Sequence, residues 1–167
     1  MDHLGSGREW DLLRKNGGLS IFPPYAEKNM KVYSGRVQAL ESILPFLKSK
    51  KEKYVIMTDA NIAVDFDFGA MLQEHIESGA DVSIAYTEQE IPEELIRAGV
   101  HEDMYYTLCL EDGRVRRIFM NSEEPGIQNL SMNIYIMERE ALIEKIHGAF
   151  VRGYSYFERD ILAPRLE

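Results

Sequence analysis

The most informative segment of this chain is Tyr54-Val55-Ile56-Met57-Thr58-Asp59. A continuous apolar run of this length is typical of a strand that is buried on both faces of a parallel sheet. Asp59 follows at the carboxyl end of the predicted strand, which is where ligands bind in open α/β sheets. A carboxylate at this place can hold Mg²⁺ against phosphate oxygens, and it can equally well form an Asx-type turn.

The segments on either side of this strand predict helices. Downstream, apolar residues from Met71 to Ile76 recur at helical spacing, Gly79 is a typical helix stop, and a second strand is expected at 81–86. Asp65 and Asp67 lie between Asp59 and this helix, and for them a turn or a helix N-cap is favoured over a metal ligand. Upstream, the apolar positions of residues 37–47 predict a helix that Pro45 kinks or splits.

The second half of the chain predicts a hairpin, a further strand and two helices. Gly113 can adopt a positive φ in the hairpin turn, and Gly148 is expected to end the first of the two helices. The predicted ranges are 104–110, 114–120, 130–137, 139–146 and 157–166. Strands that alternate with helices predict an α/β fold with a mixed, mostly parallel, Rossmann-like sheet in a single domain.

Composition narrows the classes of function. The 167 residues carry 19 Lys and Arg against 28 Asp and Glu, for a net charge of −9. An acidic chain of this kind is not expected to bind nucleic acid, because phosphate contacts need a basic face. No apolar stretch approaches the roughly 20 residues that span a bilayer, and residues 1–10 do not resemble a signal peptide, so a cytoplasmic protein without membrane contact is expected.

Isolated residues of other reactive types are interpreted structurally. Cys109 is the only cysteine and lies in an apolar run, so a buried core thiol is favoured over a nucleophile. The four histidines, His3, His75, His101 and His147, lack metal-ligand spacing. The chain also lacks the three spaced glycines of dinucleotide-binding loops and the Gly-Lys-Ser/Thr ending of phosphate loops.

Four stretches, in this order, resemble a known family. They are Gly5 to Tyr25 with its Gly-Ser-Gly-Arg-Glu-Trp and Phe-Pro-Pro-Tyr motifs, Val32 to Leu40, Tyr54 to Phe66, and Leu130-Ser131-Met132-Asn133-Ile134-Tyr135. Together they resemble the bacterial glucose-1-phosphate adenylyltransferases, also called ADP-glucose pyrophosphorylases. The resemblance implies a nucleotide-diphospho-sugar transferase fold and a role in glycogen synthesis.

The resemblance also implies the chemistry and the residues of a site. In this family glucose 1-phosphate attacks the α-phosphorus of ATP, pyrophosphate leaves, and Mg²⁺ offsets the developing charge. Gly35 and Gln38 match the nucleotide-contacting stretch Gly-Thr-Ala-Asp-Ala, and Asp59 matches a metal-binding aspartate that also lies near the nucleotide. Ser131 matches the serine of Ser-Met-Gly-Ile-Tyr, which lies near the sugar phosphate.

Several departures from the family pattern point away from catalysis. The family's Gly-Asp-His is Thr58-Asp59-Ala60, its Thr-Ala-Asp is Arg36-Val37-Gln38, and the lysine expected near Met120-Asn121-Ser122 is missing. The second metal aspartate, in the family's Asp-Phe-Gly-x-Asp stretch, aligns with Tyr156, ahead of Phe157-Glu158-Arg159-Asp160. A tyrosine cannot hold Mg²⁺ as a carboxylate does, so tight Mg²⁺ binding is not expected.

This pattern resembles the regulatory, D-type subunit of the family, which pairs with a catalytic adenylyltransferase subunit. We therefore predict a regulatory role without activity of the chain by itself. Two alternatives stay open: an active sugar-nucleotide transferase that has replaced the missing contacts, and a non-enzymatic interaction module. The family's first strand, its Gly-rich triphosphate loop and its C-terminal β-helix have no counterpart in residues 1–167, so the chain is expected to be the central part of a nucleotidyltransferase domain.

Overall fold

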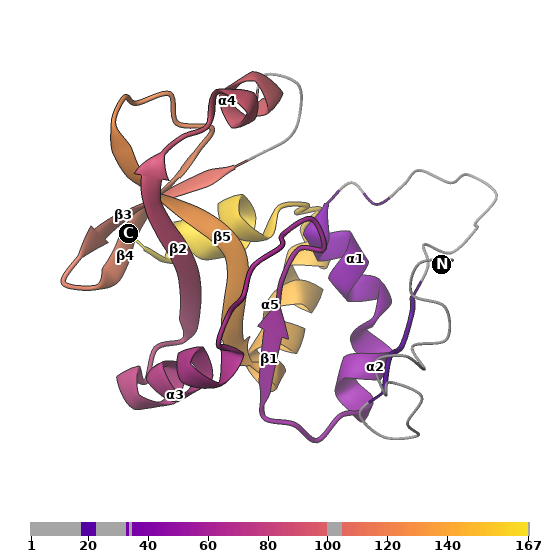
Figure 1. Cartoon of the computed structure of the whole chain (residues 1–167). Coiled ribbons are helices and arrows are strands. Elements are labelled where there is room, and N and C mark those ends of the chain that lie inside the picture. Colours follow the sequence, from indigo (N-terminus) through magenta and orange to yellow (C-terminus); the bar gives the residue numbers. More distant parts are fainter. Residues whose placement is uncertain (1–17, 23–32, 34, 100–104, 167) are drawn as a thin grey trace. The chain divides into compact units, whose positions relative to one another are not determined.

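The fold is given by a computed structural model that describes residues 18–22, 33, 35–99 and 105–166. The chain divides into two compact units, Met1–Tyr33 and Ser34–Glu167, and the elements below belong to the second unit (Figure 1). Most of the first family-like stretch, together with Val32, His3 and His101, lies outside the described residues.

One sheet is built around a long central strand. The strands are β1 (Tyr54–Met57), β2 (Val82–Glu90), β3 (Tyr106–Glu111), β4 (Arg114–Met120) and β5 (Ile127–Glu138). Along one edge β5 pairs with β2 over its whole length, and along the other edge it pairs with β3 near its start and with β1 near its end. Tyr135 thus lies between Met57 of β1 and Ile84 of β2. The hairpin partner β4 extends the sheet beyond β3.

The directions of the strands differ from the mostly parallel, Rossmann-like sheet that the sequence predicts. Every pairing among the described strands is antiparallel. β1 and β2 do run in the same direction, because both are antiparallel to β5, but β5 lies between them and they share no ladder. The order of elements along the chain was predictable, whereas the insertion of β5 (Ile127–Glu138) between β1 and β2 (Val82–Glu90) was not a local property of the sequence. The described part of the fold is therefore a mixed α/β arrangement with an antiparallel sheet.

A bulge interrupts β5 at a position that matters for the site. Ala85 pairs with Ile134, but the next residue, Tyr86, pairs with Ser131, so Met132 and Asn133 stand outside the regular register. Asn133 has a φ of 55°. Asparagine tolerates this left-handed conformation better than most residues, and a bulge re-aims the side chains next to it.

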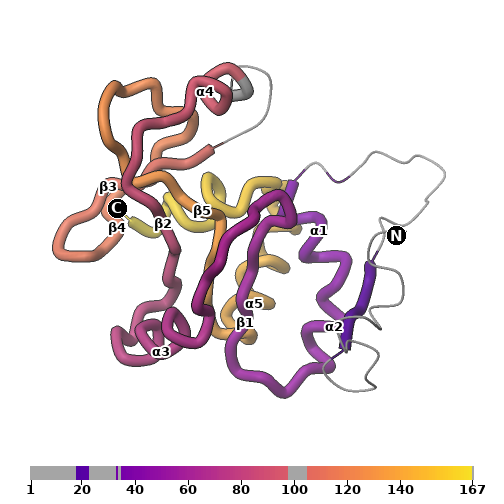
Figure 2. The backbone as a smooth tube through the Cα atoms, viewed as in Figure 1, coloured from indigo at the N-terminus to yellow at the C-terminus, as the bar shows by residue number. Residues whose placement is uncertain are grey.

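Helices cover both faces of the sheet. α1 (Arg36–Ser42), α2 (Leu44–Ser49) and α5 (Arg139–Val151) gather near β1, while α3 (Phe68–Ser78) lies on the side of β2 (Figures 1 and 2). The short α4 (Glu93–Gly99) follows β2, and the chain ends in a π-helical turn, Glu158–Leu162, and a 3₁₀ turn, Ala163–Arg165. Among the described residues, no helix is long and apolar enough to cross a membrane.

The main core lies under α1, α2, α5 and the π-helical turn. Met57, Tyr135 and Met137 point to this face of the sheet and pack against the apolar sides of these helices. The helical members of the core are Val37, Leu44, Leu47, Leu142, Ile143, Ile146, Ala149, Phe157, Ile161 and Leu162. On the other face, α3 places the buried His75 edge-on to Tyr54 and within 2.8 Å of the Ser83 hydroxyl.

Several local predictions are confirmed. Pro45 lies in the first turn of α2, so the predicted helix is split at Ile43. Gly79 ends α3 with a φ of 61°, and the β3–β4 turn places Asp112 and Gly113 at φ values of 51° and 72°, as a tight hairpin turn requires.

Three local predictions are wrong. β1 is not buried on both faces, because Ile56 is 39% exposed. α5 continues through Gly148 to Val151, which shows that helix packing overrides a single glycine. Cys109 is exposed rather than part of the core: the first three residues of β3, Tyr106 to Leu108, are buried, and the exposed part of the strand begins at Cys109.

Candidate functional site

The Asp59 carboxylate lies directly after β1 and is held by two side chains. Arg36 Nη2 donates to one carboxylate oxygen, Oδ1, at 2.6 Å, and Asn133 Nδ2 donates to the other, Oδ2, at 2.9 Å. The bulge in β5 brings Asn133 to this place. Both carboxylate oxygens are therefore engaged by donors that belong to the chain, although a third of the Asp59 side chain is still exposed.

Arg36 links Asp59 to a second carboxylate. Its Nη1 donates to Glu158 Oε1 at 2.5 Å, and its guanidinium lies over the Tyr135 ring, 5.2 Å from the centroid. Burial alone would lower the pKa of Arg36, but the nearby carboxylates of Glu158 and Asp59 outweigh this effect, so the pKa is raised. Arg36 is thus a permanent cation between two anions.

Glu158 is buried under this arginine, at the start of the π-helical turn. Its Oε1 also accepts a hydrogen bond from the Tyr135 hydroxyl at 2.8 Å. Burial and the Glu158 carboxylate raise the pKa of both Tyr135 and Tyr106, so these hydroxyls remain protonated. We call the group formed by Arg36, Asp59, Asn133, Tyr135 and Glu158 the Asp59 cluster.

A close contact of the backbone fixes the start of α1. A Cβ atom on Gly35 would lie 2.3 Å from the Ser155 carbonyl oxygen, which also accepts a hydrogen bond from the Val37 amide at 3.2 Å. The Asp160 carboxylate holds the same loop, because it accepts the amides of Ser155 and Tyr156 at 3.0 Å each. Gly35 is therefore needed for the close approach that places Arg36 next to Glu158.

The structure brings some of the residues predicted from the sequence together and separates others. Ser131 is buried, and its hydroxyl accepts the Asn133 amide at 3.1 Å, so it adjoins the Asp59 cluster. Gln38 is half-buried on α1, two residues after Arg36. Two residues correspond to about 200° around a helix, so Gln38 lies on the side of α1 opposite to Arg36. Asp67 caps α3 by accepting the Ala70 amide at 2.9 Å, as the structural interpretation predicts, and Asp65 is exposed.

The surroundings of Asp59 do not suit a divalent cation. A metal needs oxygen lone pairs turned toward it, whereas Asp59 faces the N–H groups of Arg36 and Asn133. The Asn133 amide oxygen instead lies 3.2 Å from the Tyr135 hydroxyl, whose single proton makes the shorter hydrogen bond to Glu158. In the parts of the chain that the structure describes, no group of three or more His, Cys, Asp or Glu residues could hold a metal ion.

The sequence interpretation assigned only Asp59 among the five members of the cluster, although a signal for three of the others was present. Arg36, Asn133 and Glu158 stand where the family-like motifs have Thr, Gly and Gly, respectively. All three replacements introduce a larger polar or charged side chain, and the structure brings all three to Asp59 or to its arginine. A basic and an acidic replacement at two motif positions were the available sign that these residues form a pair.

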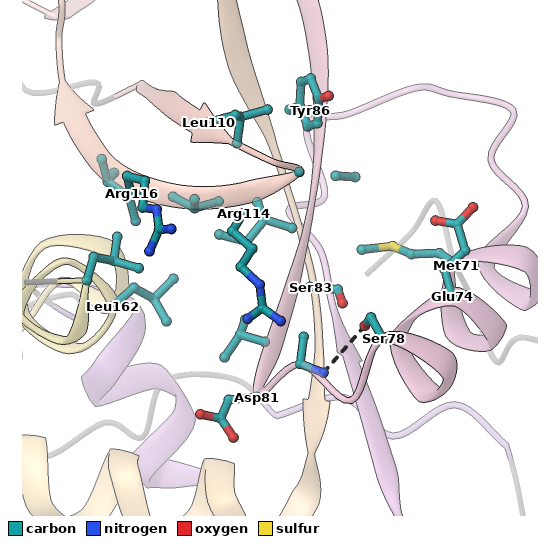
Figure 3. Close-up of a pocket in the computed structure, with 18 of the residues that line it drawn as sticks. Met71, Glu74, Ser78, Asp81, Ser83, Tyr86, Leu110, Arg114, Arg116 and Leu162 are labelled. Atoms are coloured by element: carbon teal, nitrogen blue, oxygen red, sulfur yellow. Dashed lines mark hydrogen bonds between the residues drawn. The ribbon is translucent and has the colours of Figure 1, made fainter.

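A second concave region lies away from Asp59. An open cavity of about 1170 Å³ is bounded by α3, β2, the β3–β4 hairpin and the C-terminal helical turns. Figure 3 shows Met71 and Glu74 on the α3 side and Arg114 extending into this space from the hairpin. None of the residues assigned from the sequence to nucleotide, sugar phosphate or metal lines this cavity.

Comparisons with known proteins identify relatives but no family model. No family model matches the chain. The chain is 32% identical over 168 residues to the glucose-1-phosphate adenylyltransferase of Bacillus subtilis, an alignment that covers 99% of this chain and 42% of that protein. It is 38% identical to the enzyme of the same name from Bacillus mycoides over 86% of this chain and 36% of the relative. The relative from Clostridium perfringens is 31% identical over 84% of this chain and 35% of its own length.

These matches agree with the resemblance seen in the sequence motifs. The chain is similar to glucose-1-phosphate adenylyltransferases over most of its length. It spans about two fifths of the length of these curated relatives.

Proposed function

We propose that this chain belongs to a subunit of the glucose-1-phosphate adenylyltransferase family, that it forms part of the nucleotidyltransferase domain, and that it acts in glycogen synthesis. In this proposal the subunit is regulatory: it assembles with a catalytic adenylyltransferase subunit and does not form ADP-glucose from ATP and glucose 1-phosphate by itself. The similarity to relatives with this name, over 84–99% of the chain, supports the family part of the proposal.

The observation that carries the regulatory part is the state of the Asp59 carboxylate. Arg36 and Asn133 each donate to one of its oxygens at 2.6 and 2.9 Å. A bound Mg²⁺ would have to displace both donors and would also come close to the Arg36 cation. Tight binding of Mg²⁺ at Asp59 is therefore not part of the proposed function.

Two further positions support the same proposal. Tyr156, which stands where the family-like motif has a second metal aspartate, stacks on the Arg159 guanidinium at 4.2 Å. At the place of the missing lysine the chain has Met120-Asn121-Ser122, which carry no positive charge to contact a sugar phosphate. Gly35, Gln38 and Ser131 remain our proposed contacts for a nucleotide and a sugar phosphate, without chemistry at these residues.

An assay of the full-length protein tests this function. Pyrophosphate release and ADP-glucose formation are measured with ATP, glucose 1-phosphate and Mg²⁺, first with the protein alone and then with the catalytic subunit encoded by the same genome. We expect no turnover alone, co-elution with the catalytic subunit, and altered kinetics of that subunit. The variant Asp59→Asn serves as control.

Turnover by the protein alone that disappears in Asp59→Asn would contradict the regulatory role and would favour the active transferase. Failure to co-elute with the catalytic subunit, together with unchanged kinetics of that subunit, would contradict the assembly part of the proposal.

A further inference from the structure

We propose that the Arg36 guanidinium takes the place of a divalent cation at Asp59, so that this chain contains a masked cation site made of Asp59 and Glu158. The inference rests on the proposed function only for the kind of cation that has been replaced. The masking itself follows from the contacts of Arg36.

The first step of the argument is the geometry of the guanidinium. Its two terminal nitrogens reach two different carboxylates, Nη2 at 2.6 Å from Asp59 and Nη1 at 2.5 Å from Glu158. A planar fork is well suited to bridging oxygen atoms in this way. Arg36 therefore lies between the two carboxylates, which is the position a bridging cation would need.

The second step concerns charge. Without Arg36, the buried Glu158 and the partly buried Asp59 would be two anions with no cation between them. Tyr135 and Asn133 supply hydrogen bonds to these carboxylates but no charge. An arginine cannot be discharged in a protein, so Arg36 always presents a positive charge to these two carboxyl groups.

The third step concerns the origin of the groups in the cluster. Arg36 begins α1, Asn133 stands on the β5 bulge, and Glu158 begins the π-helical turn. π-helical turns are uncommon and occur frequently at functional sites. Three separate elements thus contribute side chains that are absent from the matching family motifs, and together they occupy the region beside Asp59.

The proposal predicts that removal of one charge unmasks the site. Binding of Mn²⁺, a paramagnetic substitute for Mg²⁺, is measured on the full chain by electron paramagnetic resonance of the free ion. The wild type and Arg36→Lys should show no specific Mn²⁺ site with a Kd below about 1 mM, because each keeps a cation between the carboxylates. Arg36→Gln should bind one Mn²⁺ at least tenfold more tightly than the wild type. The double variant Arg36→Gln/Asp59→Asn should lose this gain.

Each outcome bears on the proposal. Specific binding by the wild type that Asp59→Asn abolishes would overturn it, as would equal binding by Arg36→Lys and Arg36→Gln. If Arg36→Gln is unfolded without metal, the readout is its refolding by Mn²⁺, followed by circular dichroism. Refolding that requires Asp59 supports the masked site, and a variant that Mn²⁺ neither binds nor refolds overturns it.

This test is separate from the test of the proposed function. Turnover by the full-length protein alone would remove the regulatory role, yet the metal titration would still report whether Arg36 excludes a cation from Asp59. Conversely, Mn²⁺ bound by the wild type at Asp59 would remove the masking, whatever the assay of ADP-glucose formation shows.

Discussion

Two arginines of this chain pair with glutamates at nearly equal distances, but in different surroundings. Arg36 lies 2.5 Å from Glu158, and their side chains are 21% and 5% exposed. Arg116, on the β3–β4 hairpin beside the open cavity, lies 2.7 Å from Glu111, and these side chains are 53% and 65% exposed. Both pairs meet the distance criterion for an ion pair, so distance alone does not distinguish their roles.

Burial is what separates the two pairs. Water screens the exposed pair, and pairs of this kind contribute about 0–1 kcal/mol to stability. Arg36 compensates a glutamate that is almost completely withdrawn from water, so its loss leaves an uncompensated buried charge. The Arg36–Glu158 pair therefore belongs to the packed interior, whereas Arg116 on the hairpin can exchange its glutamate for water or for another anion.

The largest effect is expected for Arg36→Met. This change removes the partner of the buried Glu158 and should lower the free energy of unfolding by about 3 kcal/mol or more. For a chain of this size, such a loss corresponds to a fall in Tm of roughly 10 °C. Thermal unfolding followed by circular dichroism measures it, and Arg116→Met is the matched control, with an expected change within about 0.5 kcal/mol.

A loss in Arg36→Met no larger than in Arg116→Met would break the comparison. A second variant sharpens it: Arg36→Met/Glu158→Leu replaces both charges by apolar side chains, and such replacements of buried ion pairs are often neutral or stabilising. We expect this double variant to be more stable than Arg36→Met alone.

Much of the local structure could be predicted from the sequence because its causes are local. Pro45 divides the predicted helix into α1 and α2, and Gly79 ends α3 at a positive φ. Asp112-Gly113 makes a tight turn. The pairing of strands has no such local cause. β5 lies between β1 and β2 although it follows them by dozens of residues, and the apolar patterns of the three strands do not state which of them are neighbours.

The site was predictable at one residue and not around it. Asp59 was found because a carboxylate directly after an apolar strand is a local pattern. Its partner Asn133 is 74 residues away in the sequence, and the Arg36–Glu158 pair spans 122 residues. The prediction of a buried Cys109 was wrong, because its apolar neighbours in the sequence did not reveal that this residue of β3 is exposed.

A smaller effect is expected from a buried group on the opposite face of the sheet. Burial lowers the pKa of His75 below 6.5, so the unfolded chain binds a proton more readily than the folded chain does. Stability from this group is fully present above pH 6.5 and is lost as the pH falls below that value. Unfolding in urea at pH 5.5 and 7.5 measures the loss, which should be smaller in His75→Gln than in the wild type.

An equal loss in wild type and His75→Gln would show that burial on the α3 face has no consequence for protonation.

The smallest effect is expected for the exposed pair itself. A double-mutant cycle with Arg116→Ala, Glu111→Ala and the double variant isolates the interaction between the two side chains. Because both are more than half exposed, the coupling energy should be at most about 0.5 kcal/mol and should decrease further in 0.5 M salt.

The corresponding cycle for Arg36 and Glu158 should give a larger coupling that salt changes little, since water and ions reach that pair poorly. A hairpin coupling equal to that of the cluster, or insensitive to salt, would mean that burial is not what distinguishes the two arginines.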